Sequence, residues 1–176
     1  EDAIKFTIVR LKNLTTKQRK LSVTGYTEWV LGDTMTNTRM HVVTEKNLET
    51  GVIFARNYYN STFAERVSFL DADGAVKSYT CDRTEFLGRN GSLTAPEGLT
   101  REKLSNKYGA ALDPCTAIQI GIDLMPEEEK EVVFRLGSAR SDHEARALAM
   151  KYKNAQAVHD AQTRVHDQWN QILGSV

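Results

Sequence analysis

Apolar and polar residues alternate through the first two thirds of the chain, which is the pattern of half-buried β-strands. The alternation is clear over residues 4–8, 21–23 and 52–54. Threonine is frequent between residues 15 and 38, and its branched side chain suits a pleated sheet that has one face in water. The pattern therefore predicts antiparallel sheets.

Two short turns are predicted to join neighbouring strands as hairpins. An Asp-Gly pair at 73–74 offers the positive-φ positions of a tight turn, so residues 66–79 are expected to form the first hairpin. A calcium loop starting at Asp71 would need glycine at its sixth position and glutamate at its twelfth, and the sequence provides neither. The second expected hairpin pairs residues 118–124 with residues 132–136 through an acidic, solvated turn.

The apolar period changes after the last predicted strand, and two helices are expected there. Ser141 and Glu144 have the spacing of a capping box, and apolar residues recur at helical intervals from there to Tyr152. Asn154 can cap a second helix, which Gly174 ends. This second helix carries a single apolar stripe that needs a neighbour, made of Val158, Ala161, Val165, Trp169 and Ile172.

Strands first and helices last is the order of an α+β chain, and this chain is mainly β. We expect a β-sandwich domain over residues 1–138 and a helical linker over residues 139–176. The length of 176 residues corresponds to about one domain. Because the chain starts at Glu1 without methionine and enters a strand almost at once, we expect a processed chain or a piece of a longer one.

The charge balance, the hydropathy and the cysteine spacing exclude several classes of ligand and partner. The chain has 23 basic and 23 acidic residues, so it has no net charge with which to attract nucleic acid. It has no signal peptide and no apolar stretch of about 18 residues, so we expect this chain to be soluble. Cys81 and Cys115 are not spaced as a metal or redox pair, which predicts reduced core thiols and no metal or other cofactor.

Motifs of the common enzyme classes are absent from the sequence. It contains no nucleophile elbow, Walker loop or dinucleotide fingerprint. The four histidines are scattered, and His159 and His166 are seven positions apart, beyond the spacing that a shared metal prefers on a helix. These motifs therefore give no support for the corresponding enzyme classes.

The densest set of chemically useful side chains lies in a polar stretch over residues 82–113, which interrupts the strand pattern. Its first third carries guanidinium, carboxylate and amide groups, which suit the hydroxyls of a sugar. An aromatic face would complete such a site, and Trp29, Tyr58 or Tyr59 could provide it. The candidate carbohydrate-binding residues are Arg83, Glu85, Arg89, Asn90 and Trp29.

A structural role for the same stretch is the alternative. Ion pairs and caps made by Asp82, Arg83 or Glu85 would tie the loop to the sheet and leave no free recognition groups. The sequence does not decide between a sugar site and a tied loop.

Five collinear sequence blocks resemble a known family. They are GYTEWVLG at 25–32, FARN at 54–57, RTEFLGRNGSL at 83–93, LDPCTAIQ at 112–119 and PEEEKEVVFRLG at 126–137. Together they resemble the β-sandwich domain of the cellobiose phosphorylase type of inverting glycoside phosphorylases. The version found in bacterial cyclic β-1,2-glucan synthases is the most similar. The blocks cover nearly the whole chain, so their order is more specific than any one of them.

The resemblance implies an antiparallel, galactose-mutarotase-like β-supersandwich that is followed by linker helices. In that family an (α/α)₆ barrel comes next and holds the catalytic acid and the phosphate site. The chain would then be a noncatalytic fragment that lacks its first strands and has the barrel and a linear or cyclic β-glucan as partners. Its parent would be a bacterial inner-membrane enzyme with cytoplasmic domains.

Two other assignments stay open. The chain could be part of a linear β-glucan phosphorylase, of the β-1,2-oligoglucan or cellodextrin type, or it could be a stand-alone carbohydrate-binding module. In each case exposed sheet edges would invite self-association between chains.

Overall fold

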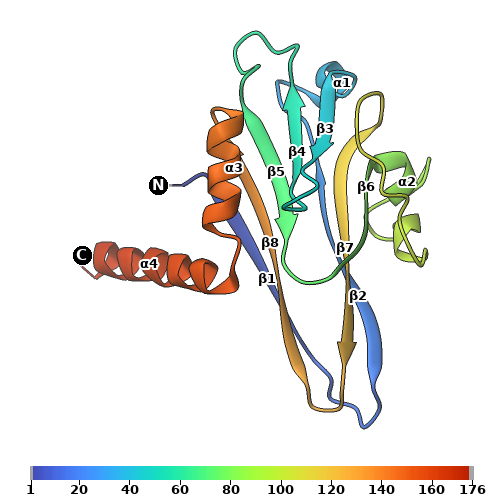
Figure 1. Cartoon of the computed structure of the whole chain (residues 1–176), viewed down its shortest axis with the longest axis vertical. Helices are drawn as coiled ribbons and strands as arrows, with labels where there is room; N and C mark the ends of the chain where they lie inside the picture. The colour runs from blue at the N-terminus through green and yellow to red at the C-terminus, as the bar shows by residue number, and fades with distance from the viewer. Residues whose placement is uncertain (1, 175–176) are drawn as a thin grey trace.

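The alternating segments form two antiparallel sheets that face each other in the computed structural model, which describes residues 2–174 (Figure 1). The larger sheet has five strands in the order β1-β8-β5-β4-β3, and the smaller has three in the order β2-β7-β6. The strands are β1 (Ile4–Lys12), β2 (Arg19–Glu28), β3 (Val42–Lys46), β4 (Ile53–Asn57), β5 (Val67–Ala72), β6 (Val76–Asp82), β7 (Pro114–Leu124) and β8 (Glu129–Ala139). The helices are α1 (Met35–Thr38), α2 (Arg83–Leu87), α3 (Asp142–Lys151) and α4 (Ala155–Leu173), with a 3₁₀ turn η1 (Glu97–Leu99). The prediction of a mainly β, antiparallel fold is confirmed.

Both predicted hairpins are wrong, because each turn carries the chain from one sheet to the other. β5 pairs with β4 and β8 in the larger sheet, whereas β6 pairs with β7 in the smaller. Likewise, β7 pairs with β2 and β6, whereas β8 pairs with β1 and β5. Gly74 does take the expected positive φ of 88°. The turn residues therefore mark where the chain reverses, while the partner strand is set by packing across the sandwich.

The main core lies between the inner faces of the two sheets. The alternating isoleucines of β7 are buried there against Leu70, Val132 and Phe134 from the larger sheet. Each such side chain stabilises the fold by about 1.5–3 kcal/mol. Gly25 of β2 lies against the ring of Phe134, where a β-carbon would come within 2.3 Å of a ring atom. The smaller sheet therefore needs glycine at that point.

Helix α3 covers the outer face of the larger sheet. It begins after Ser141, whose hydroxyl accepts a hydrogen bond from the backbone N–H of Glu144 at 3.3 Å, as the predicted cap requires. Ala145 and Ala149 are buried against aromatic side chains of β4 and β5. Figure 1 shows the helix lying along the sheet. The predicted periodicity of this helix is confirmed.

Helix α4 packs on the body over its first two turns only. Asn154 caps it, accepting from the N–H of Ala157 at 2.8 Å, and Val158 and Ala161 are buried near Tyr152. Beyond that point the helix projects away from the sandwich (Figure 1). Val165 is 53% exposed, Trp169 57% and Ile172 48%, so the outer half of the predicted stripe faces solvent. No helix within residues 2–174 combines the length and apolar character needed to cross a membrane.

A buried charge cluster fastens the corner between α3 and α4 to the larger sheet. Arg135 of β8 is fully buried, and its guanidinium donates to Asp71 at 3.3 Å, to Asp73 at 3.4 Å and to the carbonyl of Lys153 at 3.1 Å. The ammonium of Lys153 donates to both oxygens of Asp71, at 2.9 and 3.1 Å. These bonds fix where α4 leaves the body.

The two cysteines are free and buried, as predicted. Cys81 and Cys115 lie on adjacent strands of the smaller sheet. Burial raises the pKa of both thiols, which disfavours the reactive thiolate. Both side chains are packed as core residues.

Candidate functional site

The polar stretch over residues 82–113 covers the outer face of the smaller sheet. Asp82 caps α2 by accepting from the N–H of Thr84 at 3.0 Å. Phe86 then packs among buried apolar side chains, and its ring stacks on Tyr26 with 4.7 Å between centroids. A small apolar core thus attaches the stretch to the smaller sheet. The polar groups of the stretch that make no bonds within the chain are the ones that could contact a ligand.

Arg83 joins the end of β2 to the start of β7. Its Nε donates to Glu28 at 3.2 Å, and one terminal nitrogen donates to Asp113 at 3.5 Å. Tyr26 also donates its hydroxyl to Glu28, at 2.7 Å. Burial first, and then this bond to the carboxylate, raise the pKa of Tyr26. Arg83 is therefore one member of a structural polar cluster rather than a free sugar ligand.

Glu85 is the anchor of the stretch. One carboxylate oxygen accepts from the backbone N–H of Ser105 at 2.7 Å, and the other accepts from the hydroxyls of Ser105 and of Thr80, the latter at 2.6 Å. Arg101 lies 3.7 Å away as an ion partner. Burial alone would raise the pKa of this carboxyl, but the hydrogen bonds outweigh burial and hold the pKa below its ordinary value. Both oxygens of the Glu85 carboxylate are therefore occupied by hydrogen bonds that hold the loop in place.

Trp29 lies in the core between the sheets, not beside the loop surface. Only 4% of it is exposed, and its indole N–H donates to the hydroxyl of Thr116 at 2.9 Å. Its ring faces are covered by core side chains. The expectation that Trp29 offers a stacking face to a sugar is therefore wrong for this structure, because an indole that fills a sandwich core has no face left for a ligand.

Arg89 and Asn90 are the free members of the predicted set. Both are exposed, and neither side chain has a hydrogen bond or ion pair to another residue within the described part of the chain. They sit in a tight turn between Gly88, which has a φ of 91°, and Gly91, whose N–H donates to the Gly88 carbonyl at 3.2 Å. The structure thus separates two free groups from Arg83 and Glu85, which support them.

A second surface region carries the exposed aromatic residues. Tyr59 follows β4, is 76% exposed and stacks on His41 with 4.1 Å between ring centroids. The two rings border a shallow hollow of about 320 Å³ whose polar lining includes Asp33, Asn37 and Asn60. Sequence reasoning named Tyr59 only as one possible aromatic face and treated His41 as scattered, because their contact joins separate loops.

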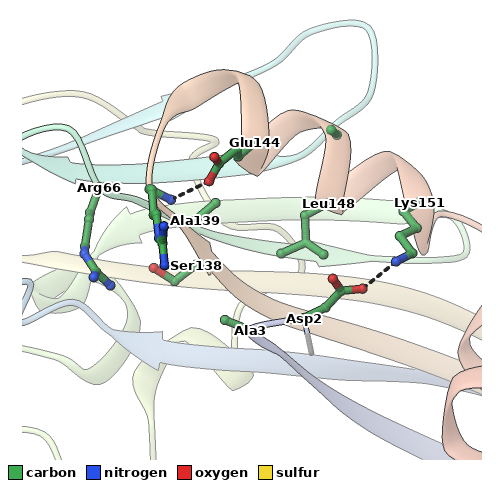
Figure 2. Close-up of a pocket in the computed structure, with 10 residues that line it drawn as sticks. Asp2, Ala3, Arg66, Ser138, Ala139, Glu144, Leu148 and Lys151 are labelled. Atoms are coloured by element: carbon green, nitrogen blue, oxygen red, sulfur yellow. Dashed lines mark hydrogen bonds and ion pairs between the residues drawn. The ribbon is translucent and has the colours of Figure 1, made fainter. Parts of the chain in front are cut away.

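A larger hollow of about 560 Å³ lies between α3 and the ends of β1 and β8 (Figure 2). At one end, Asp2 accepts from Lys151 at 2.7 Å and from Tyr152 at 2.6 Å. The hydrogen bond from Lys151 lowers the pKa of Asp2 most. Arg66 and Glu144 line the other end (Figure 2). No group of three possible metal ligands comes together within residues 2–174.

Comparisons with known proteins place this fold among carbohydrate-active proteins. Residues 1–155 match the model of the glycosyl hydrolase 94 supersandwich domain. The chain is 34% identical over 144 residues to the cyclic β-(1,2)-glucan synthase NdvB of Rhizobium meliloti, a match that covers 80% of this chain and 5% of that protein. It is 27% identical over 149 residues to a cellobionic acid phosphorylase of Neurospora crassa, covering 82% of this chain and 19% of that protein. The chain thus spans only a small part of either relative.

Proposed function

Because the chain belongs to the glycosyl hydrolase 94 supersandwich family, we propose that it is the noncatalytic supersandwich domain of a cyclic β-1,2-glucan synthase. The family that the sequence blocks predicted is confirmed. One observation carries the finer proposal, namely the 34% identity to a glucan synthase over 80% of the chain. On this view a larger parent makes the glucan and controls its length, and this domain supports the part that does so.

A parent that is a linear β-glucan phosphorylase is the second candidate. The 27% identity to a cellobionic acid phosphorylase over 82% of the chain favours it. Both candidates give this chain the same supporting role and differ in the chemistry of the parent. We favour the synthase because the identity to it is higher over a similar length.

We propose that the sandwich body ends at about residue 138 and that the two helices lead toward an (α/α)₆ barrel of the same parent. The exposed outer half of α4 supports this proposal, since Val165 and Trp169 present an apolar stripe to solvent. A barrel helix packed on that stripe would bury it. The location of the parent at a bacterial inner membrane, with its domains in the cytoplasm, rests on the family resemblance alone.

We further propose that the turn around Arg89 and Asn90 contacts the glucan. Both side chains are exposed and unpaired, and a guanidinium next to an amide suits adjacent sugar hydroxyls. Arg83 and Glu85 act indirectly, since their bonds to the sheet hold α2 in place. The turn therefore combines free recognition groups with a rigid base.

Replacing Arg89 by alanine is expected to weaken β-1,2-glucan binding about tenfold, which is the usual effect of losing a hydrogen bond from a charged group. Isothermal titration of cyclic and linear β-1,2-glucans against both proteins would measure this change. Arg164→Ala is the matched control, because Arg164 is an exposed arginine on α4. Equal losses in the two variants, or no binding by the unmodified chain at millimolar glucan, would contradict the proposed contact.

A noncatalytic role predicts that this chain alone releases no glucose 1-phosphate from β-glucans in the presence of phosphate and transfers no glucosyl group. Glu85, an acid of the predicted site, already accepts hydrogen bonds from Ser105 and Thr80 that hold the loop in place. Phosphorolysis would be measured as the release of glucose 1-phosphate. A phosphorylase that contains the barrel would serve as the positive control. Turnover that survives purification to homogeneity would refute the noncatalytic assignment without bearing on glucan binding.

A further inference from the structure

Asn90 and Gly91 form the sequence pair at which an asparagine side chain is most easily lost as ammonia. In that reaction the backbone nitrogen of the following residue attacks the carboxamide carbon, and a side chain on the following residue hinders the approach. Glycine has no side chain to hinder it. Asn90 is the only asparagine in the sequence that precedes a glycine. The sequence therefore makes Asn90 the most reactive asparagine of the chain.

The fold leaves the carboxamide of Asn90 free. It makes no hydrogen bond to another residue of the described chain, and residues 89–95 are all exposed. Other asparagines in turns are held in place. The side-chain oxygens of Asn47 and Asn60 each accept two backbone N–H groups, at 2.9 or 3.0 Å. Because a held carboxamide cannot rotate toward the next backbone nitrogen, the fold restrains these two and leaves Asn90 able to react.

The turn itself requires the glycine that makes Asn90 reactive. Its ends are closed by the N–H of Gly91, which donates to the carbonyl of Gly88 at 3.2 Å. A β-carbon on Gly91 would come within 1.6 Å of the carbonyl oxygen of Leu87, so this conformation admits only glycine there. The bond to Gly88 is at the long end of the normal range and lies in an exposed loop, where local opening costs little free energy. It can therefore slow the attack but not prevent it.

We propose that Asn90 is a site of spontaneous deamidation in the folded protein. The nitrogen of Gly91 forms a bond to the carboxamide carbon of Asn90, and the bond from that carbon to the side-chain nitrogen breaks. The side-chain nitrogen leaves as ammonia and takes the proton of the Gly91 amide, which leaves a cyclic imide. Water then opens the ring at either carbonyl carbon. One opening gives aspartate, and the other gives isoaspartate, whose backbone runs through the side-chain carbon.

Each conversion places a carboxylate next to Arg89. A carboxyl of ordinary pKa is ionised at neutral pH, so a neutral amide becomes an anion beside a guanidinium. The chain has 23 acidic and 23 basic residues, so one conversion gives it a net negative charge. The isoaspartate product also lengthens the turn by one backbone carbon. The reaction does not depend on the proposed function, whereas its effect on glucan binding does.

Mass spectrometry of the folded chain tests the proposal. The chain is held at mildly alkaline pH and is then cleaved after glutamate at mildly acidic pH, which keeps residues 86–97 in one peptide. We expect this peptide to gain about one dalton and to contain isoaspartate, while the peptides that carry Asn47 and Asn60 stay unchanged. A synthetic peptide of residues 86–97, treated in the same way, is the positive control.

Three results of this experiment would overturn the proposal. The first is that the folded chain keeps the amide of Asn90 over the time in which the synthetic peptide loses it, because the fold would then protect the residue. The second is that Asn47 or Asn60 converts before Asn90. The third is a product that contains aspartate without isoaspartate, because direct hydrolysis of the side chain, without the cyclic imide, gives only aspartate.

Isoelectric focusing gives a second measurement that follows the charge. The native chain should develop a more acidic band, and the band should grow as fast as residue 90 converts. Asn90→Gln is the matched variant, because residue 90 is exposed and the longer glutamine side chain would have to close a larger ring. We expect no such band from this variant over the same period. A band that grows equally fast in both proteins would place the reaction at another residue and refute the assignment to Asn90.

Discussion

Replacing Asp71 with alanine is expected to lower the free energy of unfolding by about 3–5 kcal/mol, the cost of removing one partner from a buried ion pair. Asp71 is 2% exposed and lies between the guanidinium of Arg135 and the ammonium of Lys153. Without its carboxylate the fully buried guanidinium of Arg135 would keep only the more exposed Asp73 as an acidic partner, and the partly exposed Lys153 would lose its ion pair. Denaturant titration followed by tryptophan fluorescence would measure the loss.

Asp73→Ala is the matched control for this experiment. Asp73 contacts the same arginine at 3.4 Å, but its side chain is 25% exposed, so water can replace part of what is lost. We expect a smaller loss, of about 1–2 kcal/mol, mainly from its bond to the backbone N–H of Val133. If Asp71→Ala costs no more than Asp73→Ala, the buried pair does not carry the stability assigned to it.

The same cluster links stability to the direction of α4. Lys153 immediately precedes the helix cap at Asn154. Its carbonyl accepts a hydrogen bond from Arg135, and its ammonium group donates one to Asp71. The exposed stripe of α4 therefore leaves the body at a fixed angle. Loss of Asp71 should lower the stability of the fold and also let the direction of α4 relative to the sandwich vary. That variation would affect any domain that packs on the stripe.

The apolar alternation predicted part of every strand except β3, which was not identified from the sequence. Period-two alternation reports burial on one side, and Ile118, Ile120 and Ile122 all face the core as expected. It did not predict which strands pair. An Asp-Gly turn suits a hairpin and also suits a connection between two sheets, and only packing across the whole sandwich separates the two cases.

The candidate site was predicted in part. The chemical groups of Arg83, Glu85 and Arg89 are visible in the sequence, but their availability depends on burial and on partners far along the chain. Arg83 is tied to Glu28, a residue 55 positions away. Arg135 shows the same limit, since an arginine within an alternating strand looks solvent-exposed until α3 and α4 are seen to cover it.

Replacing Glu85 with alanine is expected to cost about 2–4 kcal/mol, because the buried hydroxyl of Thr80 and the N–H of Ser105 lose their acceptor. Hydrogen exchange should rise over residues 97–105, which this carboxylate holds to α2 and β6. Glu97→Ala is the matched control, since Glu97 also lies near Arg101, at 4.0 Å, but is largely exposed. Comparable losses from the two variants would mean that the loop is held by its apolar contacts instead.

The pH dependence of this loss gives an independent check. Burial raises the pKa of Glu85, but the bonds from Ser105 and Thr80 prevail and lower it below the ordinary value of 4.5. A lowered carboxyl pKa stabilises the fold above the unfolded value, and this stabilisation disappears as the pH falls through the folded value. The difference in unfolding free energy between the native chain and Glu85→Ala should therefore be constant near neutral pH and shrink below about pH 4.5. Carboxyls such as Asp2 and Asp142, whose pKa values are also lowered, are present in both proteins and cancel in the comparison. A difference that stays constant down to pH 3 would show that Glu85 acts through its size rather than its charge.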